Sequence, residues 1–192
     1  MEKLLVKHIV ERAATIFPNR EIVARTGSDG RHRYTYSDYY RRIRQLGSAL
    51  DKLGVEVGDG VGVLGWNSYQ HLEIDYAAVC MGAIYQGLNF RLGVDSLVYM
   101  SNLARNKVLF VEEAFLPLAE QMVAAGADSI THFVLIADNP AAVETTLSPL
   151  LEYEQLLTTA SNDYDFPESV DENDPVAVCF TGGTTGRPKG CP

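Results

Sequence analysis

Apolar residues recur every three or four positions in some segments of the chain and fill short uninterrupted runs in others. Helical spacing starts at Leu5 and stops at Pro18, which predicts an N-terminal helix. The segments EIVAR and HRYTY flank the turn-rich TGSDG and predict the two strands of a hairpin. Thr35 and Asp38 then form a capping-box pattern before an apolar helix face that ends at Gly54. The first part of the chain is therefore predicted to be helix, hairpin and helix.

From Gly60 onwards, short apolar runs alternate with segments of helical periodicity. The runs predict strands, and they are VGVLG, IYQGL, VLFV, HFVLI and VAVCF. Four helices are predicted between these strands. The first is capped by Asn67 or Ser68, and the second is capped by Asp95. The third starts at Ala114, and the fourth starts at Pro149 with Ser148 as its cap. Apolar strands that alternate with helices are typical of a mainly parallel sheet with helices on both faces, so we expect an α/β fold.

We expect residues 1–192 to form one unit, with the helix and hairpin in 1–35 and an acidic connector in 161–175. The connector, SNDYDFPESVDENDP, carries six acids and two prolines. Its Asp163 and Asp165 are followed neither by the glycine nor by the distal glutamate that a calcium loop needs. A solvated linker is the favoured interpretation.

Charge and composition exclude several classes of function. The chain has 192 residues, a net charge of −9 and 46% hydrophobic residues. Residues 108–186 contain no lysine or arginine, which argues against a nucleic-acid partner because phosphate backbones require clustered cations. The longest uncharged apolar run, 77–85, is too short to span a bilayer. We therefore expect a soluble, cytoplasmic protein without a transmembrane segment.

Histidines and cysteines offer no metal site. The four histidines are scattered without metal-ligand spacing, and His71 is interpreted as a surface or interface residue. Cys80, Cys179 and Cys191 form no CxxC pair, which favours a reducing compartment. Cys179 lies inside an apolar run, so its thiol is predicted to be buried.

Two glycine motifs differ in their context. Gly60, Gly62 and Gly65 match GxGxxG, but the dinucleotide motif must follow a strand and open a helix. Here the match itself is the predicted strand, so we interpret it as a turn that leads into a glycine-containing strand.

The second motif, FTGGTTGRPKG, follows the apolar run VAVCF, at the carboxyl end of a predicted strand, where open parallel sheets bind ligands. Glycines allow backbone N–H groups to converge on an anion, and threonine hydroxyls and a lysine add donors and charge. The motif lacks the GK[ST] of a Walker loop. A flexible surface loop is the alternative to phosphate binding. The candidate phosphate-binding residues are Thr181, Gly182, Gly183, Thr184, Thr185, Gly186 and Lys189.

The stretch TGGTTGRPKG resembles the phosphate-loop signature of the AMP-forming adenylating enzymes, which include acyl-CoA synthetases, luciferases and nonribosomal-peptide adenylation domains. The segments YTYSDYYRRIRQLGSALDKLGVEVGDGVGVLGWNS and CMGAIYQGLNFRL are also similar to this family, so the resemblance extends over most of the chain. NKVLFVEEAFLPL, DYDFPE and the double glycine at 182 and 183 are similar to the fatty-acyl-CoA synthetase branch.

This resemblance implies a two-step ligase. A carboxylate attacks the α-phosphorus of Mg-ATP, and the thiol of CoA then displaces AMP from the acyl-adenylate. The resemblance implies ATP, Mg²⁺ and CoA as cofactors or co-substrates, a medium- or long-chain fatty acid as substrate, and a role for the loop in holding the β- and γ-phosphates. An aryl or other acid is the alternative substrate.

The resemblance also implies a missing part. In the family, the adenine-binding segment, the magnesium-binding glutamate, the ribose-binding aspartate and the catalytic lysine all follow the loop. We therefore expect this chain to be an N-terminal portion of such an enzyme, inactive by itself, with neither catalytic nor metal-binding residues of its own. A non-catalytic interaction module that forms a homodimer is the alternative from another class.

Overall fold

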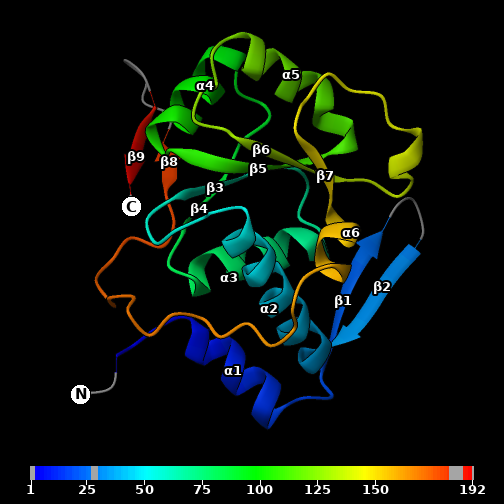
Figure 1. Ribbon diagram of the computed structural model, residues 1–192, viewed down its shortest axis with the longest axis vertical. Coiled ribbons are helices and arrows are strands. Elements are labelled where there is room, and N and C mark those ends of the chain that lie inside the picture. The colour runs from blue at the N-terminus through cyan, green and yellow to red at the C-terminus, as the bar shows by residue number, and fades with distance from the viewer. Residues whose placement is uncertain (1–2, 27–29, 182–187, 192) are drawn as a thin grey trace.

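The computed structural model describes residues 3–26, 30–181 and 188–191, and its elements follow the predicted alternation of strands and helices (Figure 1). In chain order they are α1 (Lys7–Ile16), β1 (Glu21–Thr26), β2 (Gly30–Thr35), α2 (Tyr36–Lys52), β3 (Gly60–Leu64), α3 (Tyr69–Cys80), β4 (Ile84–Gly87), α4 (Val94–Leu103), β5 (Asn106–Glu112), η1 (Glu113–Phe115), α5 (Leu116–Ala124), β6 (His132–Ile136), η2 (Pro140–Ala142), β7 (Leu150–Glu152), α6 (Tyr153–Thr158), β8 (Cys179–Thr181) and β9 (Lys189–Cys191).

The main sheet has five parallel strands in the order β4-β3-β5-β6-β7. Figure 1 shows α4 and α5 above this sheet and α1, α2, α3 and α6 below it. The predicted α/β class, with helices on both faces of a parallel sheet, is confirmed. The predicted N-terminal helix and hairpin are also present, because β1 and β2 pair in antiparallel register. Among the described helices, none has the length and apolar character needed to cross a bilayer.

The central strand β5 explains why the strands look uniformly apolar in the sequence. Val108 and Phe110 pack into the core that α2, α3 and α6 cover, whereas Leu109 and Val111 pack into the core beneath α4 and α5. Since successive side chains of a strand point to opposite faces, a strand covered on both faces has no polar side to show.

Helix α2 is specified by the chain at both of its ends. The Thr35 side chain accepts a hydrogen bond from the Asp38 N–H, and the Asp38 carboxylate accepts one from the Thr35 N–H, which confirms the capping box. Gly54, just past the helix, has a φ of +75°, a conformation that glycine adopts without strain. Between the ends, Ile43 and Leu50 are fully buried, as the helical periodicity predicts.

The GxGxxG match is indeed a strand, as its context predicts. A Cβ placed on Gly60 would lie 2.3 Å from the carbonyl oxygen of Ala104. The first glycine of the match therefore allows the start of β3 to approach the end of α4 closely, and no helix begins at the motif.

Two of the predicted helix starts are wrong. Pro149 does not begin a helix: its carbonyl accepts a hydrogen bond from the Phe133 N–H, and β7 follows it as a fifth strand. The helix after it, α6, begins at Tyr153 with Glu152 as its cap. Pairing with β6 decides this outcome, and local sequence does not reveal that partner. Helix α4 is capped by Gly93, and Asp95 lies in the first turn, where an acid also favours the helix dipole.

Residues 161–175 contain no helix or strand and run alongside α1 and α2 (Figure 1). The acidic side chains of this connector are exposed, whereas Phe166 and Val170 are buried. The ammonium group of Lys7 donates to the Phe166 carbonyl at 3.3 Å. The connector is therefore anchored to the N-terminal helix, which brings two distant segments of the chain together.

Candidate functional site

The structure brings together the two ends of the predicted phosphate loop. Thr181 is the last residue of β8, Lys189 is the first residue of β9, and the two lie directly opposite each other in an antiparallel pair. The hydroxyl of Thr181 donates to the Lys189 carbonyl at 3.5 Å, and both side chains are exposed. The other predicted residues, Gly182, Gly183, Thr184, Thr185 and Gly186, lie outside the described residues. The strand β9 was not predicted from the sequence.

The segment that leads into the loop is attached to the edge of the main sheet. The Tyr85 N–H donates to the Val176 carbonyl at 2.9 Å, and the Val178 N–H donates to the Tyr85 carbonyl at 2.9 Å. These bonds form a parallel bridge between Tyr85 and Ala177. The loop therefore begins at the carboxyl end of a segment parallel to β4, in agreement with the position expected for a ligand site in such sheets.

His71, interpreted from the sequence as a surface or interface residue, is half-buried and has two defined partners. Its Nδ1 lies 2.9 Å from the Trp66 carbonyl, and its Nε2 forms a short hydrogen bond with the Tyr85 hydroxyl. Because a carbonyl only accepts, Nδ1 carries the proton in the neutral ring, and Tyr85 donates to Nε2. The histidine thus links the turn after β3 to the strand that holds the loop segment.

The prediction that Cys179 is buried is wrong, because its side chain is exposed. The run VAVCF is only partly a strand of the sheet: its middle pairs with β4, and its end turns into the two-stranded hairpin β8–β9. Cys191, also exposed, lies directly opposite Cys179 in that hairpin, whereas Cys80 is buried. The sequence does not reveal this proximity because no CxxC spacing marks it.

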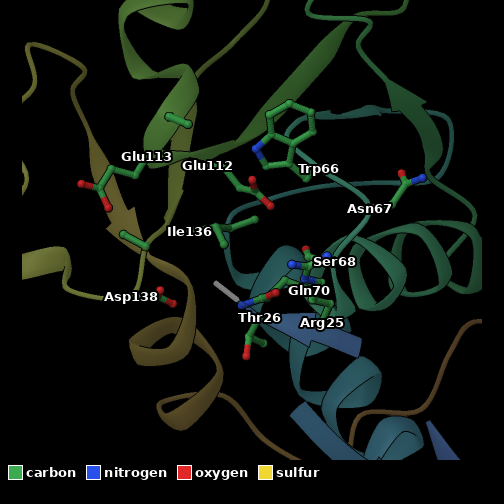
Figure 2. Close-up of a pocket in the computed structure, with 12 residues that line it drawn as sticks. Arg25, Thr26, Trp66, Asn67, Ser68, Gln70, Glu112, Glu113, Ile136 and Asp138 are labelled. Atoms are coloured by element: carbon green, nitrogen blue, oxygen red, sulfur yellow. The ribbon is translucent and has the colours of Figure 1, made fainter. Parts of the chain in front are cut away.

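A crevice opens at the carboxyl ends of the central strands (Figure 2). After β3, the chain places β4 on one side of it and then crosses to place β5 on the other side. The direction in which successive strands join the sheet therefore reverses between β3 and β5. Open α/β sheets bind ligands at such a switch point. The crevice measures about 930 Å³ and is lined by Arg25, Thr26, Trp66, Asn67, Ser68, Gln70, Glu112, Glu113, Ala114, Ile136, Ala137 and Asp138.

One wall of this crevice is aromatic and another is acidic. The Trp66 ring, 53% exposed, packs against Phe90 and Phe115 with ring centroids 4.7 and 5.1 Å away. Burial raises the pKa of Glu112, and hydrogen bonds from the Trp66 backbone and the Ser68 side chain oppose the shift. Sequence reasoning missed these residues, because only the strand order identifies where the switch point lies.

The described residues contain no cluster of metal-ligating side chains. Within the part of the chain that the structure describes, no three His, Cys, Asp or Glu side chains come together in a group that could hold a metal ion. We assign no step to the metal here.

Comparison with known proteins decides the family. The sequence profile of the family described as "AMP-binding enzyme" matches residues 10–192. The chain belongs to the AMP-binding enzyme family. Its curated relatives include a 3-methylmercaptopropionyl-CoA ligase of Ruegeria lacuscaerulensis (37% identical), a medium-chain-fatty-acid–CoA ligase of Ectopseudomonas oleovorans (33%) and a long-chain-fatty-acid–CoA ligase of Thermus thermophilus (36%). Each match covers 98% of this chain.

The chain spans about a third of the length of these curated relatives, 33–35% in the three cases. Among solved structures, the anthranilate CoA ligase AuaEII in complex with anthranoyl-AMP is 26% identical and matches with a TM-score of 0.84. That match covers 99% of this chain and 34% of the ligase. The N-terminal domain of FACL13 from Mycobacterium tuberculosis, 23% identical, shares the fold with a TM-score of 0.78. The chain is thus similar to acid–CoA ligases throughout its length.

Proposed function

We propose that this chain is the N-terminal portion of an ATP-dependent, AMP-forming acid–CoA ligase, and that the acid is a medium- or long-chain fatty acid. The similarity of nearly the whole chain to three acid–CoA ligases carries this proposal. Two of the three act on fatty acids by name, which favours a fatty acid over the shorter sulfur-containing acid of the third. An aryl acid is the alternative, because the anthranilate CoA ligase shares the fold.

The proposed chemistry follows from the poor electrophilicity of a carboxylate. Its oxygen becomes part of a good leaving group when it attacks the α-phosphorus of ATP and releases pyrophosphate. CoA then attacks the acyl carbon, and AMP leaves. Donors positioned where negative charge develops lower the barrier of the first step.

We assign the β- and γ-phosphates to the loop between β8 and β9. Thr181 supplies a hydroxyl and Lys189 an ammonium group at the two ends of that loop, which the hairpin holds opposite each other. Gly182, Gly183, Thr184, Thr185 and Gly186 supply the remaining donors in this proposal. The lysine ammonium acts on phosphate as a compact point charge.

Acid-dependent ATP–pyrophosphate exchange by the complete gene product tests the proposal. The panel of acids contains octanoate, palmitate, 3-methylmercaptopropionate, acetate and anthranilate. We expect exchange with octanoate or palmitate. If exchange occurs only with anthranilate, the proposed substrate is an aryl acid and not a fatty acid. If no acid supports exchange, the proposed ligase activity is contradicted. The 192-residue chain alone is expected to give no exchange.

The exposed apolar residues of α1 favour a second candidate function, self-association of the chain as a non-catalytic module. Ile9 and Ile16 lie in α1, within the helical apolar spacing that starts at Leu5, yet they are 61% and 54% exposed. Leu4 and Phe17 extend this apolar surface at the two ends of the helix. Light scattering on the 192-residue chain distinguishes a dimer from a monomer. A dimer that Ile9→Glu dissociates would support this role, and a monomer at high protein concentration would contradict it.

A further inference from the structure

The two exposed cysteines form a cross-strand pair that encloses the whole phosphate-loop sequence. Cys179 lies in β8 and Cys191 in β9, and they are direct partners in the antiparallel register. The residues between them are FTGGTTGRPKG. Neither the proposed ligase chemistry nor the family match gives these two thiols a role.

The register meets the Cα-distance requirement for a disulfide. Residues directly opposite each other in an antiparallel pair have Cα atoms about 4.5–5.5 Å apart, and their side chains leave the same face of the ribbon. Disulfides join residues whose Cα atoms are about 4.4–6.8 Å apart. Both thiols are free and exposed, so a reagent can reach them without unfolding the chain.

We propose that Cys179 and Cys191 are a redox-reactive dithiol that closes to an intramolecular disulfide at the base of the phosphate loop. The oxidant in this proposal is a low-molecular-weight disulfide. One cysteine thiolate attacks the reagent, the S–S bond of the reagent breaks, and a first reagent thiol leaves. The second cysteine thiolate then attacks the protein sulfur of the mixed disulfide and releases a second reagent thiol. The two protein thiols are oxidised as the reagent is reduced to two thiols.

This bond would constrain the ends of the loop that the proposed function assigns to phosphate. Thr181 and Lys189 are the next pair on the same face of the hairpin, because each lies two residues from one of the cysteines. A covalent link at the base removes conformations from the chain it encloses. The consequence for phosphate binding rests on the proposed function, whereas formation of the bond does not.

Cys80 gives the chain an internal control. It is 3% exposed, and burial raises the pKa of its thiol to about 12, so it should not react in the folded protein. The variant Cys80→Ser leaves only the cross-strand pair. The variants Cys179→Ser and Cys191→Ser each remove one partner from an exposed position.

The experiment treats the folded 192-residue chain with oxidised glutathione, blocks the remaining thiols and maps the peptides without reduction. We expect a 179–191 linkage without bound glutathione in the native chain and in Cys80→Ser. Cys179→Ser and Cys191→Ser should instead keep one glutathione on the remaining exposed cysteine. Glutathione retained on both exposed cysteines of the native chain, or linkage only between chains, would overturn the inference.

A pyrophosphate titration of the reduced chain separates this inference from the proposed function. If the Cys179–Cys191 disulfide forms but pyrophosphate binds in neither redox state, the dithiol proposal is supported and the assignment of phosphate to the loop is contradicted. Pyrophosphate binding without linkage would support the phosphate loop and overturn the dithiol.

Discussion

Removal of Arg42 should destabilise the fold more than removal of any ordinary surface charge. Its guanidinium donates from Nε to Glu73 at 2.8 Å and from its two terminal nitrogens to Glu154 at 2.8 and 3.0 Å. The Glu73 side chain is fully buried and also accepts a hydrogen bond from the Tyr153 hydroxyl at 2.7 Å. These groups connect α2, α3 and α6 beneath the sheet.

The substitution Arg42→Met keeps an apolar stem of similar length but leaves Glu73 with a buried, uncompensated charge. Breaking a buried ion pair from one side costs about 3–5 kcal/mol, and we expect a loss of this size near neutral pH. The Glu154 carboxylate contributes little to it, because its side chain is 45% exposed and water replaces the lost partner. Urea-induced unfolding followed by circular dichroism measures the difference.

Two variants isolate the cause. Adding Glu73→Gln to Arg42→Met removes the buried charge, so the double variant should regain at least about 1 kcal/mol relative to Arg42→Met alone. Arg41→Met, the neighbouring position on α2, removes a half-exposed arginine whose ion pair with Asp38 spans 3.5 Å. It should change stability by less than about 1 kcal/mol.

The pH dependence has a definite sign. Burial raises the pKa of Glu73 above its ordinary value, while hydrogen bonds from Arg42 and Tyr153 oppose the shift. Loss of Arg42 therefore raises this pKa further. A carboxyl group whose pKa is higher in the folded state binds its proton more tightly there. Its contribution to the free energy of unfolding is fully present below the unfolded-state pKa, and it is lost as the pH rises through the folded-state pKa. The deficit of Arg42→Met should therefore be largest above the raised folded-state pKa of Glu73, and it should shrink as the pH falls towards the unfolded-state pKa of glutamate. A deficit below about 1 kcal/mol, or one that Glu73→Gln fails to reduce, would refute this reasoning.

Three further predictions test other links between sequence and structure. Gly60→Ala should destabilise the chain by about 1–3 kcal/mol in urea unfolding because its Cβ would clash with the Ala104 carbonyl. Gly93→Ala places its Cβ with no atom within 4 Å and loses only the preference for glycine at the N-cap of α4, so it should cost less; equal losses would contradict the close-approach argument. Thr35→Ala should lower the stability by about 1 kcal/mol in thermal unfolding, because it removes the hydroxyl that caps α2. Thr35→Ser keeps a hydroxyl and should therefore keep most of that stability; a loss of the same size in both variants would show that the hydroxyl is not responsible. Lys189→Ala should weaken pyrophosphate binding in isothermal titration and reduce its salt dependence, whereas Lys52→Ala, an exposed lysine of α2, serves as the control; equal effects would indicate unspecific charge attraction.

Local patterns in the sequence predicted most of the elements and the fold class. The helix α2 follows from its capping box, its apolar spacing and Gly54, all of which act within a few residues along the chain. The uniformly apolar runs predicted a sheet covered on both faces, and the sheet is parallel with helices on both sides. The family was also predicted from the sequence, since the loop signature resembles that of adenylating enzymes and the family profile matches.

Tertiary structure alone decided which distant groups meet. Whether Pro149 precedes a helix or a strand depends on β6, and whether Cys179 is buried depends on the hairpin with β9. Arg42 and Glu73 look like ordinary surface charges in the sequence, yet the packing of α2, α3 and α6 makes them a buried pair. The position of Pro149 and the pair of Arg42 with Glu73 depend on contacts between residues far apart in the chain, whereas periodicity and capping reflect only near neighbours. The exposure of Cys179 depends on a strand pairing that periodicity does not reveal. The sequence therefore determined most of the elements and the candidate loop. The strand order of the main sheet decided where the switch-point crevice lies, and the pairing of β8 with β9 decided that Cys179 and Cys191 face each other.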